Sequence, residues 1–177
     1  MCCHGDEAVN SAILDQLGNL RANGYEMVIG LRDLYPHTNA ELAGLEQGLA
    51  AVFPAADFDV RTRIVVREIE AWFLQEWLHY ERVDASLTVD VVNATIGEDV
   101  DIRVDSVEYI VEHPAKMLDK VYRRVGKKYN KKRFHTANII YHLDYANIYT
   151  EVRALSVSLN RFLDDIDNFL APMREPG

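Results

Sequence analysis

The chain has 177 residues, of which 49% are hydrophobic and 27% are charged, and its formal net charge is −9. This length fits a single domain, and the hydrophobic fraction excludes a wholly disordered chain. Five prolines and nine glycines exclude a collagen-like or low-complexity sequence. A protein with this acidic charge spread evenly over its surface would bind nucleic acid or an anionic membrane poorly.

The N-terminal residues bear on location. The only two cysteines, Cys2 and Cys3, are adjacent, and the chain has no further cysteine to pair with either, which favours a reducing compartment. Acidic residues at positions 6, 7 and 15 do not fit a signal peptide. No apolar run approaches the roughly 20 residues that span a bilayer. We therefore expect a cytoplasmic protein without a membrane segment.

Apolar periodicity in the first half predicts an alternation of helices and strands. Helices are expected over residues 6–20, 40–53 and 67–80. A continuous apolar run at 27–31 is typical of a buried parallel strand, and residues 58–66 alternate in the manner of a second strand, with Arg61 and Arg63 on one side. Two strands joined by a helix form a parallel βαβ unit.

The second half is expected to be mostly helical. Helices are predicted over residues 85–96, 114–125, 136–143, 146–153 and 155–170, whereas residues 98–106 are irregular or form a short edge strand. The fold class is therefore α/β, with a small, mainly parallel sheet, flanking helices and a helical C-terminal half. Because no flexible linker separates the halves, we predict a single domain over residues 1–177, with an α/β core over 1–83 and a helical part over 84–177.

Three acidic residues are candidate ligands for a metal ion. Asp33 directly follows the first strand, and in open α/β sheets ligands bind at the carboxyl ends of strands. Glu68 and Glu70 open the helix that follows the second strand, and oxygen-rich sites of this kind suit Mg²⁺. The alternative is a loop aspartate and two glutamates that the helix dipole favours in a first turn.

A basic segment, residues 116–133, interrupts the acidic chain. It holds nine of the 19 basic residues and a single acidic one, Asp119. The nine are Lys116, Lys120, Arg123, Arg124, Lys127, Lys128, Lys131, Lys132 and Arg133. The first five recur at helical spacing and would form one ridge, and Tyr122, Tyr129 and Phe134 are interleaved or adjacent. Clustered cations with aromatic rings suit phosphate binding and base stacking. A solvated helix face followed by a lysine-rich loop is the alternative.

Two further groups lie towards the C-terminus. Asp164, Asp165 and Asp167 are expected to form a solvated face or a counter-charge for the basic segment. The tyrosines at 141, 145 and 149 recur every four residues and predict a packing stripe along a helix.

Several short motifs resemble the DUF4276 family of bacterial, Toprim-like proteins. They are the stretch from Val28 to Asp33, the stretch from Val65 to Leu74 with its Glu-x-Glu-Ala-Trp sequence, residues 114–118, and the closing helix at 159–170. The resemblance implies a small parallel sheet, and Toprim enzymes hold Mg²⁺ for phosphoryl transfer with an early glutamate and an Asp-x-Asp pair. Asp33 would match the first aspartate of that pair, but Tyr35 stands in place of the second. His4-Gly5 stands in place of the early glutamate and its glycine. The first strand that should precede them is nearly absent, so the true N-terminus is expected upstream of Met1.

Three functions are therefore open. The first is a Mg²⁺-dependent phosphodiester enzyme acting on nucleic acid, with Asp33, Glu68 and Glu70 as catalytic metal ligands and the basic segment holding the backbone. The second is an interaction protein whose basic segment docks on an acidic surface, including that of a second copy in a homo-oligomer. The third is a nucleic-acid-binding protein with a degenerate metal site.

Overall fold

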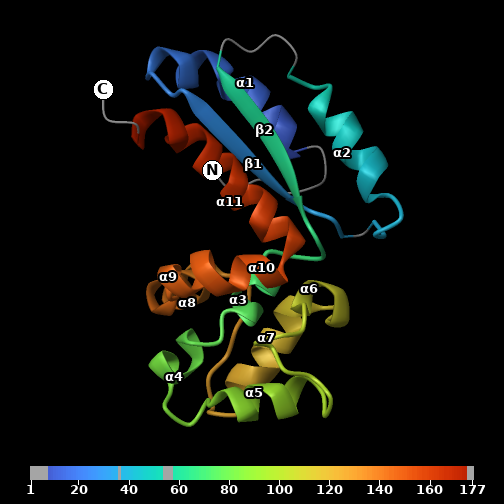
Figure 1. Ribbon diagram of the computed structural model, residues 1–177, viewed down its shortest axis with the longest axis vertical. Helices are drawn as coiled ribbons and strands as arrows, with labels where there is room; N and C mark the ends of the chain where they lie inside the picture. Colours follow the sequence, from blue (N-terminus) through green and yellow to red (C-terminus); the bar gives the residue numbers. More distant parts are fainter. Residues whose placement is uncertain (1–7, 36, 54–57, 175–177) are drawn as a thin grey trace. The chain divides into compact units, whose positions relative to one another are not determined.

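The structure is a computed structural model that describes residues 8–35, 37–53 and 58–174 (Figure 1). The chain divides into two compact units, which are described separately below. Unit 1 comprises residues 1–65 and 164–177, and unit 2 comprises residues 66–163. The prediction that residues 1–177 form a single domain, whose two units would unfold together, stays a prediction. His4 and Gly5, which the resemblance sets against the early glutamate and its glycine, lie outside the described residues.

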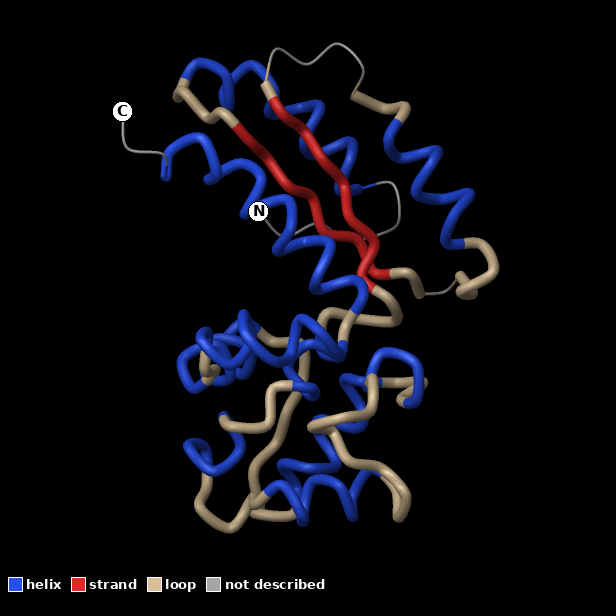
Figure 2. Tube along the Cα trace, viewed as in Figure 1, coloured by secondary structure: helices blue, strands red, loops and turns tan. Residues whose placement is uncertain are grey.

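Unit 1 contains a two-stranded parallel sheet with helices on its faces (Figure 2), which confirms the α/β fold class. Strand β1 (Met27–Asp33) pairs with β2 (Asp59–Val65) in register from Met27 opposite Asp59 to Asp33 opposite Val65. Helix α1 (Ala8–Ala22) precedes β1, and helix α2 (Leu42–Ala50) connects the two strands. Both strands and both helices lie where the apolar pattern predicts them, within a few residues at each end.

Gly30 lets α1 approach the sheet closely. A Cβ atom at this position would lie 2.7 Å from Cγ1 of Val9 and 2.9 Å from Cδ1 of Ile13, both on α1. Such distances are too short for carbon atoms, so a larger residue would force the Val9 and Ile13 side chains, or the helix that carries them, to shift. On the same face, the Thr62 hydroxyl donates a hydrogen bond of 2.9 Å to the Asn10 side chain.

The opposite face of the sheet holds a charged cluster that corrects one prediction. Arg61 and Arg63 of β2 both reach Asp165 of helix α11 (Val157–Arg174), at 2.6 Å and 2.5 Å. Asp165 is buried, so it neither belongs to a solvated face nor serves the basic segment. Burial alone would raise the pKa of Asp165, but the hydrogen bonds and charges of Arg63 and Arg61 outweigh burial and hold that pKa below its ordinary value.

Unit 2 consists of short helices joined by turns and loops, with no strand among its described residues, as expected of the second half (Figure 2). The predicted edge strand at 98–106 is instead a series of turns. The predicted helix at 67–80 starts later, at Glu70, after Arg67 takes a left-handed conformation (φ 66°), and it is broken into two because the chain is extended at Glu76. The helical segments besides the start of α11 are α3 (Glu70–Gln75), α4 (His79–Val83), α5 (Val89–Ile96), α6 (Val107–Ile110), α7 (Pro114–Arg123), α8 (Arg133–His142), α9 (Tyr145–Asn147), the π-helical η1 (Ile148–Val152) and α10 (Arg153–Leu155).

One apolar core joins these short helices. Its fully buried members come from helices α3 to α8 and from the turns between them, and include Leu74, Tyr80, Leu87, Val92, Ile102, Leu118 and Ile139. Short helices are marginal alone, so their stability comes from this shared packing. The core fixes α7 and α8, which carry the basic segment.

A buried carboxylate holds the start of α11 within unit 2. Glu108 of α6 accepts hydrogen bonds from the hydroxyl groups of Ser156 and Ser158, both at 2.7 Å, and from the Val157 backbone N–H at 2.8 Å. The first N–H groups of a helix lack intrahelical partners, and an acidic side chain there satisfies them and complements the helix dipole. Glu108 is thereby a structural residue, and its carboxylate is fully occupied.

Candidate nucleic-acid interface

The basic segment comprises most of helix α7, the loop that leads to α8 and the first residue of α8. Helix α7 ends at Arg123, and Gly126 takes a left-handed conformation (φ 71°) that turns the chain. The predicted ridge is therefore shorter than the spacing indicated. Lys116, Lys120 and Arg123 lie on the helix, whereas Lys127 lies beyond the turn.

Four of the nine basic side chains have partners inside unit 2. Lys120 and Lys127 each donate a hydrogen bond to a backbone carbonyl oxygen, at 2.7 Å and 2.9 Å, and Arg123 donates to Asp119 at 2.6 Å. Lys131 pairs with two glutamates. The side chains of the other five are exposed and form no hydrogen bond or ion pair with a described residue: Lys116, Arg124, Lys128, Lys132 and Arg133.

Glu68 and Glu70, two of the predicted metal ligands, converge on Lys131. The Lys131 ammonium nitrogen lies 2.6 Å from Oε1 of Glu68 and 3.5 Å from Oε2 of Glu70. The other oxygen of Glu68 accepts a hydrogen bond of 3.1 Å from the Ala115 N–H, in the first turn of α7. The basic loop is thus tied to the start of α3 by its own lysine.

Glu70 is buried, with 3% of its surface exposed, and its second partner is Tyr129. The Tyr129 hydroxyl donates a hydrogen bond of 2.7 Å to Oε1 of Glu70. Burial and this hydrogen bond both raise the pKa of the Tyr129 hydroxyl, so the group stays protonated as a donor. The Tyr129 backbone N–H donates to Asp119 at 2.9 Å, which fixes the loop at a second point.

The acidic pair as arranged does not offer a divalent ion a set of open ligands. Three of the four carboxylate oxygens of Glu68 and Glu70 accept hydrogen bonds from protein groups, and the Lys131 ammonium offsets one of the two negative charges. Asp33, the last residue of β1, belongs to unit 1, whereas the glutamates belong to unit 2. Over residues 8–35, 37–53 and 58–174, no group of three or more His, Cys, Asp or Glu residues is placed to hold a metal ion. The magnesium site and its catalytic role stay predictions.

The aromatic residues of the basic segment divide into buried and exposed ones. Tyr122 and Tyr129 are 3% and 5% exposed, so they pack in the core and are not available for base stacking as predicted. Phe134, the second residue of α8, is 79% exposed. Tyr141, further along the same helix, is 85% exposed, and Tyr145 and Tyr149 are exposed too, so the predicted packing stripe of tyrosines is wrong.

Two pockets flank Tyr129, which lines both. One, of about 250 Å³, is lined by Ala115, Lys116, Asp119, Tyr129, Asn130 and Lys131. The other, of about 240 Å³, lies on the side of α8 and is called the α8 pocket below. Its lining residues are Val83, Tyr122, Lys127, Lys128, Tyr129, Phe134, His135, Asn138 and Ile139. Each pocket thus combines exposed cations with a buried tyrosine.

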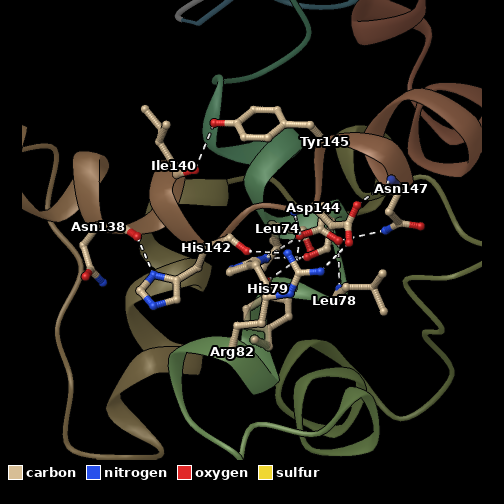
Figure 3. Close-up of polar contacts among 12 residues, drawn as sticks. Leu74, Leu78, His79, Arg82, Asn138, Ile140, His142, Asp144, Tyr145 and Asn147 are labelled. Atoms are coloured by element: carbon tan, nitrogen blue, oxygen red, sulfur yellow. Dashed lines mark hydrogen bonds and ion pairs between the residues drawn. The ribbon is translucent and has the colours of Figure 1, made fainter.

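Sequence reasoning missed a buried polar network next to this surface (Figure 3). The Glu76 carboxylate accepts hydrogen bonds from the backbone N–H groups of Leu78 (2.8 Å) and His79 (3.0 Å) and from the Asn147 side chain (2.8 Å). The His79 ring in turn contacts the Tyr122 hydroxyl at 2.9 Å through Nε2. No spacing motif signals this cluster, because its members come from α4, α7 and α9.

This network is a structural centre. Glu76 and His79 are fully buried, and burial alone would raise the pKa of Glu76, but the hydrogen bonds from His79, Asn147 and Leu78 outweigh burial and lower it. Arg82, at the end of the network in Figure 3, pairs with Asp144. Every Glu76 oxygen is occupied by a protein donor, so the carboxylate holds α4 and α9 in place.

Comparison with protein-family models, with curated proteins and with solved structures finds no match to this chain. The resemblance to the DUF4276 and Toprim-like proteins therefore stays a prediction. Among the helices that the structure describes, none is long and apolar enough to cross a membrane.

Proposed function

We propose that this protein binds nucleic acid through the basic segment and the first turn of α8. The observation that carries the proposal is the set of five exposed cations whose side chains form no hydrogen bond or ion pair with a described residue, Lys116, Arg124, Lys128, Lys132 and Arg133, which runs directly into the exposed ring of Phe134. Cations that are not needed within the fold are available to phosphates. Aromatic rings beside them add stacking on bases.

The distribution of charge supports a local interface. Unit 1 carries five basic and 13 acidic residues, whereas unit 2 carries 14 basic and 15 acidic residues. Salt screens charges beyond a Debye length of about 8 Å at physiological ionic strength. Nucleic acid therefore responds to the charges nearest to it, and the acidic residues elsewhere restrict contact to the basic segment.

The test is a salt titration of binding, followed by fluorescence anisotropy of labelled DNA and RNA oligonucleotides. A variant with Lys128, Lys132 and Arg133 all changed to Ala loses three phosphate contacts. The slope of log affinity against log salt should then become shallower by about 2, since each contact contributes about 0.7 on single strands. The same relation predicts a loss of affinity of about 100-fold at 0.1 M salt.

A matched pair of single substitutions separates local contacts from net charge. Lys132→Ala and Arg103→Ala each remove one positive charge from an exposed side chain of unit 2, but Arg103 lies outside the basic segment and pairs with Asp101. Only Lys132→Ala should weaken binding. Equal losses would point to non-specific attraction, and the absence of any DNA or RNA binding by the wild-type protein would refute the proposal. Salt-sensitive self-association without nucleic-acid binding would favour docking on the acidic surface of a second copy.

A further inference from the structure

The exposed ring of Phe134 calls for an explanation within unit 2. Phenylalanine buries a large apolar area when it packs, and aromatic rings bury roughly 150–250 Å² each. Phe134 nevertheless remains 79% exposed, at the first turn of a helix whose next buried residue, Ile139, is fully inside the core. Its ring stands edge-on to His135, with ring centres 5.8 Å apart and an angle of 90° between the planes. Because most of its surface is exposed, the Phe134 ring can be reached by a flat partner.

The α8 pocket lies beside this ring, and its walls suit a nucleobase. Its volume of about 240 Å³ is below the roughly 300 Å³ of sites for drug-sized ligands, so it fits a single ring system. Asn138 is one of the lining residues, its side-chain amide has no partner among the described residues, and an amide can both donate to and accept from a base edge. The His135 ring is fixed by a hydrogen bond of 2.6 Å from Nδ1 to the Lys128 carbonyl oxygen.

The cations beside the pocket are placed for the phosphate of the same nucleotide. Lys128 lines the pocket and is exposed, whereas Lys127 lines it while donating a hydrogen bond to the Val83 carbonyl oxygen. Lys132 and Arg133 immediately precede Phe134 in the chain and are also exposed. Aromatic rings that stack on bases and exposed cations that contact phosphates are the groups by which proteins hold single-stranded nucleic acid.

We infer that the protein selects single-stranded nucleic acid, because one unpaired base stacks on Phe134 at the α8 pocket while its phosphate lies near Lys128. This inference rests on the proposed function and names its substrate class. In a duplex the base faces are covered by their neighbours, so a duplex reaches the basic segment through its phosphates alone. A base in a single strand can turn out and stack without unpairing.

The experiment compares four oligonucleotides of equal length and sequence: single-stranded DNA, single-stranded RNA and the corresponding duplexes. Phe134→Ala is compared with Tyr141→Ala. Tyr141 is the matched control, because it is an exposed aromatic residue on the same helix, stands edge-on to His142 at 5.3 Å and 83°, and does not line the α8 pocket. Both side chains are exposed, so both variants should keep the wild-type circular dichroism spectrum.

We expect Phe134→Ala to weaken single-strand binding by about 5- to 150-fold, which is the equivalent of 1–3 kcal/mol for one stacked base. Duplex binding by the same variant should change less than about twofold, since its phosphate contacts remain. Phe134→Trp should keep the single-strand preference, and Tyr141→Ala should bind like the wild type. A 2-aminopurine probe in the single strand should lose fluorescence on binding to the wild type and not to Phe134→Ala.

The outcomes separate the inference from the proposed function. Equal wild-type affinity for single strands and duplexes would refute single-strand selection and leave nucleic-acid binding intact. Equal losses in Phe134→Ala and Tyr141→Ala would show that the α8 pocket is not the stacking site, which also overturns the inference. If the wild type binds none of the four oligonucleotides, the proposed function fails and the inference with it. A difference between DNA and RNA strands identifies which sugar the site accepts.

Discussion

Tyr129→Phe tests whether the buried hydroxyl–carboxylate pair holds the basic loop. The change removes one hydroxyl group and keeps the ring. Glu70, which is 3% exposed, then keeps only the Lys131 ammonium at 3.5 Å, because its Oε2 has no hydrogen bond and its Oε1 loses the one it had. A hydrogen bond to a charged group contributes about 1.5–3 kcal/mol, so the free energy of unfolding of unit 2 should fall by about 2 kcal/mol.

Urea unfolding measured by tryptophan fluorescence reports on this unit directly. The only two tryptophans, Trp72 and Trp77, both belong to unit 2. With a urea dependence of about 2 kcal/mol per molar, the transition midpoint should fall by about 1 M. Tyr141→Phe is the control, because it removes a hydroxyl from an exposed tyrosine and should shift the midpoint by less than about 0.2 M.

A double-mutant cycle assigns the loss to the pair. In a Glu70→Gln background the acceptor is a neutral amide, and the hydroxyl should contribute only about 1 kcal/mol. The coupling between the two positions is therefore expected to be about 1 kcal/mol. If Tyr129→Phe unfolds at the wild-type midpoint, or if the two substitutions are additive, the Tyr129–Glu70 bond does not hold the loop.

Two further predictions concern unit 1. Asp165→Asn should destabilise the sheet by about 2 kcal/mol, below the usual 3–5 for a broken buried pair because Arg61 and Arg63 are about one-third exposed. Since the pKa of Asp165 is lowered in the folded protein, its contribution to stability is present at neutral pH and is lost as the pH falls below about 4. Amide hydrogen exchange of β1 and β2 should therefore differ between the wild type and Asp165→Asn at neutral pH and become equal in acid. Asp33→Ala should leave nucleic-acid affinity within about twofold, because Asp33 belongs to the unit without the basic segment. Cleavage of nucleic acid in Mg²⁺ or Mn²⁺ that Asp33→Ala abolishes would instead establish the metal-dependent enzyme.

The elements that sequence reasoning located are those with a strong local signal. The run from Met27 to Leu31 is apolar throughout and is bounded by turn residues, and β1 covers it. The helix predicted over residues 67–80 is interrupted between Gln75 and His79 for a reason that the sequence pattern does not contain. Glu76 uses its side chain to accept from the N–H groups of Leu78 and His79, which starts a new helix and ends the old one.

Sequence reasoning located the basic residues of the site, but it did not predict which of them pair with acidic residues of the fold. The spacing of the nine cations says nothing about which of them the fold uses, and Lys131 joins Glu68 across 63 positions. Tyr129 carries the same sequence signal as Phe134, an aromatic residue among lysines, yet one is buried and the other exposed. The burial of Asp165 was missed for the same reason, because its partners Arg61 and Arg63 lie on a strand more than 100 positions earlier in the sequence. Burial and long-range partners depend on tertiary packing, which local patterns do not encode.

The cluster of Asp165 with Arg61 and Arg63 has a consequence for protein synthesis. Both arginines leave the ribosome more than 100 residues before Asp165, the carboxylate that they share. At about 5–20 residues per second, β2 waits some 5–20 s for its counter-charge. Unit 2 is continuous in sequence, and its translation is complete before the C-terminal part of unit 1 is made. We therefore expect the later-starting unit to fold earlier on the ribosome, while Arg61 and Arg63 of the N-terminal sheet lack Asp165 as a partner until α11 emerges.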